Sequence, residues 1–273
     1  MPEALLRRLT GAARSRGVQS QRADSEAPLE AAQQGGGHIE TIRRAYRIAV
    51  RDLRACYNPT GIVAGRLHFN AYWARDGFWA LFGALVLGDY DQARAHLDTF
   101  IRYQLPSGRL PVRIEFVGHT FGGYHTWRAH PKALYRAGSM FVDPLDPAAL
   151  FVVAAREYFL HTRDMSFCDR FNPVVDRATH WLMQRDRDGD GVIENRYLAD
   201  WMDSILKKDK VFNINVISYE GLRACATMKE ALGRGEEAEW LSADVLRVIT
   251  EGRFGEAGTA PIQQLGDSLP CYR

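Results

Sequence analysis

What this 273-residue sequence lacks excludes several large protein classes. No apolar run reaches the length of a bilayer, so the sequence predicts no membrane-spanning helix. The four cysteines lie far apart and form neither a CxxC pair nor a cysteine–histidine metal motif, which favours structural thiols. No glycine-rich phosphate loop follows an apolar strand, which argues against a parallel nucleotide-binding fold.

The sequence also has little excess of positive over negative charge. The 35 Lys and Arg residues nearly balance the 33 Asp and Glu residues and are interleaved with them, which leaves a formal net charge of +2. This pattern argues against a nucleic-acid partner. The arginine-rich first residues have no apolar core of a secretory signal, so we expect a cytoplasmic protein without a membrane partner.

Two segments of different character are present. Residues 1–37 are rich in Arg, Ala, Gln, Ser and Gly and have no apolar periodicity, which predicts a flexible N-terminal extension. Residues 38–273 are expected to form one folded domain, because apolar residues there recur at steps of three or four.

The periodicity predicts an all-α fold made of helical hairpins. Helices are expected over about 39–56, 76–87, 90–101, 146–158, 167–182, 212–232 and 236–251. Tight corners should then fall near Gly88, Arg163 and Gly233, at similar intervals along the chain. Such a repeat suggests hairpins stacked in an array or ring. Residues 109–142 have no helical period and are expected to form a long, partly extended loop.

Two clusters combine tryptophan with carboxylates. One is Tyr-Trp-Ala-Arg-Asp-Gly-Phe-Trp at 72–79, and the other is Asp-Trp-Met-Asp-Ser at 200–204. Aromatic faces stack on the apolar C–H faces of a sugar, whereas carboxylates and guanidinium groups hydrogen-bond its hydroxyls. The two clusters together therefore point to a carbohydrate-processing enzyme.

A series of five motifs carries a family resemblance. Their order is Trp-Ala-Arg-Asp at 73–76, Gln-Leu-Pro-Ser-Gly-Arg-Leu-Pro at 104–111, Asp146 before Leu-Phe-Val, Asp-Arg-Asp-Gly-Asp-Gly-Val-Ile-Glu at 186–194, and the cluster at 200–204. This order resembles inverting glycosidases built on a double ring of helices. It is similar to the amylo-α-1,6-glucosidase domain of glycogen debranching enzymes and, more distantly, to glucoamylases and trehalases. The resemblance implies an (α/α)6-toroid-like fold, here an incomplete ring.

The resemblance also implies roles for single residues at the first motif. Arg75 and Asp76 would hydrogen-bond the outer hydroxyls of a terminal sugar, and Trp73 would line its subsite. Local chemistry offers an alternative in which Asp76 caps the following helix and Arg75 pairs with a nearby acid. Asp146 has the same two interpretations, as a sugar contact by its place in the family pattern or as a helix cap followed by proline.

In the second cluster, the resemblance places the general acid just after the tryptophan. Asp203 is the first choice and Asp200 the second, and Trp201 would line the substrate. Burial against an indole raises the pKa of a carboxyl, as an acid that protonates a leaving group requires. The alternative is that both aspartates are exposed loop carboxylates, one of them an N-cap.

The aspartate-rich run at 186–194 permits a calcium interpretation, but Tyr197 stands where an EF-hand loop needs its bidentate glutamate. Asx turns explain the run as well. We therefore expect no metal and no cofactor.

One departure from the family pattern concerns the second carboxylate. An inverting glycosidase needs a base to activate water, and no motif over 236–273 resembles it. We expect either part of a longer protein or a shortened relative. The function expected is inverting hydrolysis of an α-glucosidic bond in an oligosaccharide or a glycogen- or starch-like glucan. The alternatives are a non-catalytic carbohydrate-binding protein, or a trehalase, invertase or sugar epimerase of the same fold. The sequence does not predict an oligomeric state.

Overall fold

The computed structural model describes residues 36–66, 69–119, 125–136, 144–196, 208–239 and 241. The chain divides into two units, residues 1–55 and 56–273. In the first unit the described part is the helix α3 (Gly36–Ala55), an amphipathic helix on which Ile42 and Tyr46 are exposed. None of the described helices is both long and apolar enough to cross a membrane.

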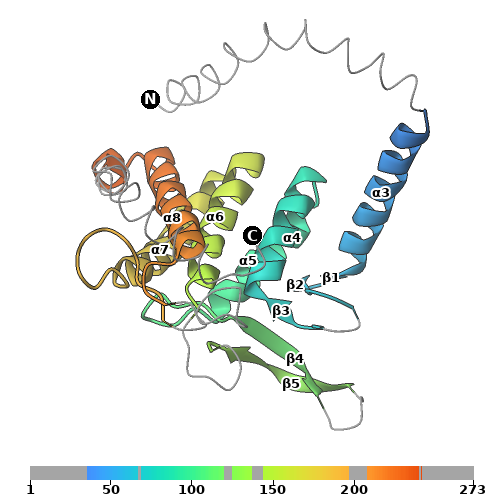
Figure 1. Ribbon diagram of the computed structural model, residues 1–273, viewed down its shortest axis with the longest axis horizontal. Coiled ribbons are helices and arrows are strands. Elements are labelled where there is room, and N and C mark those ends of the chain that lie inside the picture. Colours follow the sequence, from blue (N-terminus) through green and yellow to red (C-terminus); the bar gives the residue numbers. More distant parts are fainter. Residues whose placement is uncertain are drawn as a thin grey trace, which may run out of the picture. The chain divides into compact units, whose positions relative to one another are not determined.

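The second unit consists mainly of helices (Figure 1). They are α4 (Ala74–Val86), α5 (Tyr90–Arg102), α6 (Asp146–Thr162), α7 (Met165–Met183) and α8 (Phe212–Ala231), and a further helical segment covers 235–239. The chain turns sharply between α4 and α5, between α6 and α7, and after α8, in left-handed residues Gly88, Arg163 and Gly233. The predicted all-α fold of helical hairpins with these three corners is confirmed.

The helices lie in two layers. Helix α6 lies between α4 and α8 and packs against both, while α5 packs on α4 and α6, and α7 packs on α6 and α8. Every residue from Asp146 to Ala155 of α6 is buried, as expected for a central helix with neighbours on all sides. The arrangement α4–α6–α8 in one layer and α5–α7 in the other is that of an arc of a helical toroid (Figure 1).

The predicted extended loop at 109–142 contains a hairpin, β4 (Arg113–His119) and β5 (His125–Leu134). It is joined by β3 (Tyr72–Trp73) in an antiparallel sheet of order β3-β4-β5, with Tyr72 opposite Ile114. A second small hairpin pairs β1 (Tyr57–Asn58) with β2 (Gly61–Ile62). Because β3 leads directly into α4, the three-stranded sheet fixes the end of α4 at which the tryptophan cluster lies.

Two local features fix the hairpins to one another. His96 of α5 is fully buried among Tyr72, Phe78 and Phe100, and its Nδ1 accepts a hydrogen bond from the Ile62 N–H at 3.1 Å. Burial without a charged partner lowers the pKa of His96 to about 3, so the ring is neutral. At the other end of α5, the turn at Gly108 (φ +93°) lies so close to the α7 backbone that a Cβ there would be 1.8 Å from a carbonyl oxygen.

Candidate functional site

The candidate site begins with an ion pair between two helix N-termini. Arg75, in the first turn of α4, donates from Nε to Oδ2 of Asp146, the first residue of α6, at 2.5 Å. The Asp146 side chain is 2% exposed and that of Arg75 is 34% exposed. The pair therefore joins a buried carboxylate to a guanidinium that reaches the surface, and it fixes two inner helices at the same end of the arc.

A cavity of about 330 Å³ opens at this ion pair. The described residues that line it come from the same ends of α4, α6 and α8: Arg75, Trp79, Asp146, Leu150, Asn213 and Ile217. Such a volume lies at the small end of the range for ligand sites, which is about 300–1,000 Å³. The cavity is thus lined by both polar and apolar side chains from the ends of three helices, and it is large enough for a small molecule.

Of these lining residues, Arg75 and Asp146 were predicted as site residues from the sequence, whereas Trp79, Leu150, Asn213 and Ile217 were not. Asn213 lies in the first turn of α8, and its buried Nδ2 has no hydrogen-bond partner in the described parts of the chain. Trp79 is one helical turn beyond Arg75, and its indole is 55% exposed. The spacing from Arg75 to Trp79 places both on one face of a helix and could have identified Trp79, whereas no motif marks Asn213.

Trp73 and Asp76 lie beside the cavity rather than among its described lining residues. Trp73 is held between Phe69, whose ring lies edge-on at 5.7 Å, and the Arg113 guanidinium, 4.8 Å from the indole centroid. Its buried Nε1 has no hydrogen-bond partner in the structure as described. Asp76 is exposed in the first turn of α4, where a negative charge is favourable.

The helix-cap alternatives can be compared directly with the structure. The N-cap residue of α4 is Trp73 and that of α6 is Leu145, and neither makes a side-chain cap hydrogen bond. Asp76 and Asp146 are therefore not N-caps. The alternative for Arg75 is met in part, because it does pair with an acid, but that acid is Asp146 of a different hairpin.

Asp200, Trp201 and Asp203 lie outside the described residues. The chain on either side of them is joined by an antiparallel bridge between Asn195 and Asp209, with N–O distances of 2.7 and 2.8 Å. Because α8 begins at Phe212, this segment leads to the helix that supplies Asn213 to the cavity.

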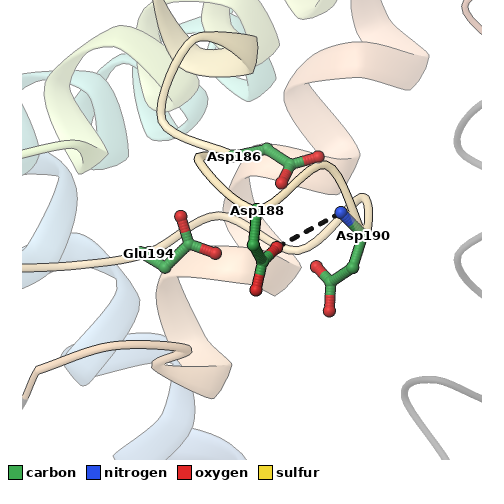
Figure 2. Close-up of side chains that lie close together, drawn as sticks. All are labelled: Asp186, Asp188, Asp190 and Glu194. Carbon is green, nitrogen blue, oxygen red and sulfur yellow. Dashed lines mark hydrogen bonds between the residues drawn. The ribbon is translucent and has the colours of Figure 1, made fainter.

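The acidic turn, residues 186–194, folds around its own carboxylates (Figure 2). Asp186 accepts hydrogen bonds from the N–H groups of Gly189 and Gly191, at 2.8 and 2.7 Å, and Asp190 accepts one from Val192 at 2.9 Å. The Asp190 bond spans two residues, as does the bond from the Asp190 N–H to Asp188 at 3.2 Å, and these two are Asx turns as predicted from the sequence. The carboxylates of Asp186, Asp188, Asp190 and Glu194 offer oxygens within 4.8 Å of one another, and the Lys210 ammonium pairs with the last three.

A larger cavity of about 460 Å³ lies beside α7 and α8, at Asp176, Cys225, Lys229 and Glu237. Burial favours a lower pKa for Lys229, but hydrogen bonds to Asp176 and Glu237 outweigh it and raise the pKa. Burial also raises the pKa of Cys225 to about 12, so this thiol is not a nucleophile near neutral pH. The charged groups at this cavity pair with one another, so the cavity at Arg75 is the better candidate for a ligand site.

Chemically, the cavity at Arg75 suits a neutral polyhydroxylated ligand. The guanidinium and the Asn213 amide supply donors, the Asp146 carboxylate supplies an acceptor, and Trp79, Leu150 and Ile217 supply apolar surface. The Arg75–Asp146 pair is internally balanced in charge, so the described lining favours no strongly charged ligand.

Comparisons with known proteins give a family match for part of the chain and a similar fold. Residues 47–126 match the family model of amylo-α-1,6-glucosidase, a segment that includes Trp73, Arg75, Asp76 and Trp79. No curated protein sequence matches significantly. The structure is similar to that of a GH78 family rhamnosidase of Bacillus sp. GL1, with a TM-score of 0.55 and 18% sequence identity.

That similarity covers 74% of this chain and 19% of the rhamnosidase chain, so the protein spans about a fifth of the length of the structure it matches. At this identity the similarity concerns the fold. The family-model match and the shared fold lead to one statement: this chain is similar to glycoside hydrolases built on a toroid of helical hairpins, and it resembles amylo-α-1,6-glucosidases over the segment that carries Arg75.

Proposed function

We propose that the cavity at Arg75 is the sugar subsite of a glycoside hydrolase. The observation that carries the proposal is the convergence of Arg75, Asp146 and Asn213, from the first turns of three helices, on one cavity that also exposes an indole. A pyranose ring presents this combination of hydroxyl groups and apolar faces. The match of residues 47–126 to a glucosidase family supports the same ligand class.

Each residue has a distinct role in this proposal. Arg75 donates to a hydroxyl of the terminal sugar while Asp146 holds its guanidinium in place, and Asn213 donates from Nδ2, which has no partner among the described residues. Asp76, exposed in the turn of Arg75, contacts an outer hydroxyl at the rim. Trp73 supports that rim, with Arg113 against its indole.

The proposed reaction is hydrolysis of an α-glucosidic bond with inversion. Asp203 is the proposed general acid, with Asp200 as the second choice and Trp201 lining the substrate. An inverting enzyme also needs a carboxylate base about 6.5–9.5 Å from the acid. Within this chain, Glu220 and Glu256 are the carboxylates to test as that base. Glu220 pairs with Arg156 and Arg223, at 2.5 and 3.1 Å, which makes it the weaker candidate. Glu256 lies outside the described residues.

A second candidate function is sugar binding without hydrolysis. Among the described residues that line the cavity, Asp146 is the one carboxylate, and it is engaged by Arg75. A carboxylate held in this way suits the positioning of a ligand better than proton transfer. Hydrolysis therefore depends on carboxylates beyond the described lining.

The experiment separates the two functions. Because a fluoride leaving group needs no protonation, Asp203→Asn should abolish hydrolysis of maltose and isomaltose yet largely spare α-glucosyl fluoride. Asp200→Asn should cost much less; the reverse pattern would make Asp200 the acid. Binding of sugar with no turnover of either substrate by the wild type would support the non-catalytic function.

Identifying the sugar that binds requires several candidate sugars to be compared. Leu150 and Ile217 on the cavity wall offer apolar surface to a methyl group, whereas a hydroxymethyl group there would need a hydrogen-bond partner. Glucose, maltose and a 6-deoxyhexose should therefore be compared by calorimetry. Preference for the 6-deoxyhexose would replace glucose in the proposal while leaving the subsite in place.

A further inference from the structure

The acidic turn is tied to the start of α8 by several contacts. Nζ of Lys210, two residues before α8, lies 2.8 Å from Oδ2 of Asp188, within hydrogen-bond distance of Asp190, and 3.9 Å from Oε1 of Glu194. Within α8, the Asn215 side chain accepts from the Ile193 N–H at 2.7 Å and donates to the Ile193 carbonyl at 3.0 Å.

The Lys210 ammonium balances a concentration of negative charge. Burial favours a lower pKa for Lys210, but the hydrogen bonds and charges of Asp188 and Asp190 outweigh it and raise the pKa to about 12. Four carboxylates this close repel one another unless a cation lies among them. The ammonium group of Lys210 therefore occupies the position that a bound cation could otherwise take.

This contact lies three residues from the cavity. Asp209, in the left-handed region at φ +63°, accepts a hydrogen bond from the Val211 N–H, and α8 then begins at Phe212. Asn213 follows in the first turn at the cavity, and its amide Nδ2 has no hydrogen-bond partner in the described part of the chain. A shift of the acidic turn relative to Lys210 would therefore move the first turn of α8 and the Asn213 amide with it.

We propose that Lys210 is the built-in counter-ion of the acidic turn and a positioning residue that holds Asn213 in the cavity. The effect on sugar affinity rests on the proposed function, whereas the effect on α8 does not. Lys210 touches no sugar in this proposal. It acts by fixing the position of the first turn of α8, which carries Asn213.

The test compares Lys210→Met, which keeps the unbranched stem and removes the charge, with Lys210→Arg and with Lys208→Met. Lys208 is the matched control, because it is exposed and lies 3.6 Å from Asp209 rather than in the acidic turn. Hydrogen exchange should be at least tenfold faster at the Ile193 and Asn215 amides in Lys210→Met, and unchanged in Lys208→Met. Unchanged exchange in Lys210→Met would overturn the proposal whether or not the protein binds sugar.

Sugar binding tests the second half. Lys210→Met should weaken maltose binding at least fivefold, Lys210→Arg should retain most of the affinity, and adding Asn213→Ala to Lys210→Met should cause no further loss beyond that of Asn213→Ala alone. Additive losses would overturn the coupling. A wild type that binds no sugar would refute the proposed function, and the exchange result would still decide the role of Lys210.

Calcium gives an independent readout of the counter-ion role. Without the ammonium, oxygens of Asp188, Asp190 and Glu194 are available to a hard cation. Millimolar calcium chloride should raise the Tm of Lys210→Met more than that of the wild type. The same response in both proteins would overturn the counter-ion assignment.

Discussion

Nε of Arg75 and Oδ2 of Asp146 lie 2.5 Å apart although the two residues are 71 positions apart in the sequence. The pair fixes the N-terminal ends of two inner helices and forms one side of the cavity. Its carboxylate is almost completely buried, so loss of the guanidinium leaves a charge without its main counter-ion.

Arg75→Ala should therefore lower the free energy of unfolding by about 1–3 kcal/mol, since a buried charged group loses its partner. Urea denaturation measures the change. Asp76→Ala, in the same turn but exposed, should change stability by less than about 0.5 kcal/mol and weaken sugar binding by about 1–3 kcal/mol. Equal losses of stability in both variants would contradict the distinction between the two residues.

Trp79→Ala should weaken sugar binding about tenfold or more with little loss of stability, because the indole is largely exposed at the cavity and supplies a stacking face. Val86→Ala is the matched control, since Val86 is 75% exposed on the same helix and is not a lining residue of the cavity. Calorimetry with maltose distinguishes them. Similar affinities in the two variants would mean that Trp79 does not contact the ligand.

Stability should depend on pH through His96. Its pKa is about 3 in the folded protein and about 6.5 when unfolded, so the unfolded state binds more protons between these values. The free energy of unfolding should fall by up to about 1.4 kcal/mol per pH unit as the pH decreases from about 6.5 toward 3. His96→Phe should lose this contribution to the slope; an unchanged slope would show that other groups cause it.

The turn before β4 gives a test of backbone packing. Gly108 and Gly88 both have left-handed φ angles, +93° and +76°, so alanine is strained at both, by about 1 kcal/mol. At Gly108 the added Cβ would also contact the α7 backbone, whereas at Gly88 no atom of the described residues lies within 4 Å of it. Gly108→Ala should thus destabilise the protein by at least about 2 kcal/mol more, measured by urea denaturation. Equal losses of stability in the two variants would indicate that the turn at Gly108 can move away from α7 at little cost.

Local patterns were sufficient to predict α3 to α8 and their corners, whereas most of the helix predicted over 236–251 lies outside the described residues. Apolar periodicity with Gly88 and Gly233 predicts where hairpins turn, and the turn at Arg163 follows because the periodic segments end on either side of it. That Arg163 adopts the left-handed conformation, in which glycine is common, could not be inferred from its side chain.

The candidate site could be predicted only in part. The motif at 73–76 identified Arg75, but its pairing with Asp146 depends on how two hairpins pack, and periodicity gives no information about that. Trp79 was visible in the sequence, yet an aromatic residue at helical spacing is equally consistent with a core position. The ion pairs of Lys210 join residues about 20 positions apart across a turn, and Asx-turn chemistry alone does not predict them.

Calorimetric titration of maltose and a 6-deoxyhexose into the wild-type chain and into Asn213→Ala tests most directly whether the cavity at Arg75 binds sugar. Asn213 contributes a cavity donor that satisfies no other described group, so its loss should leave the fold intact. At least one sugar should bind the wild type, and it should bind Asn213→Ala about tenfold more weakly. Equal affinity in both proteins, or no binding of either sugar to the wild type, would contradict the claim that this cavity is a sugar subsite.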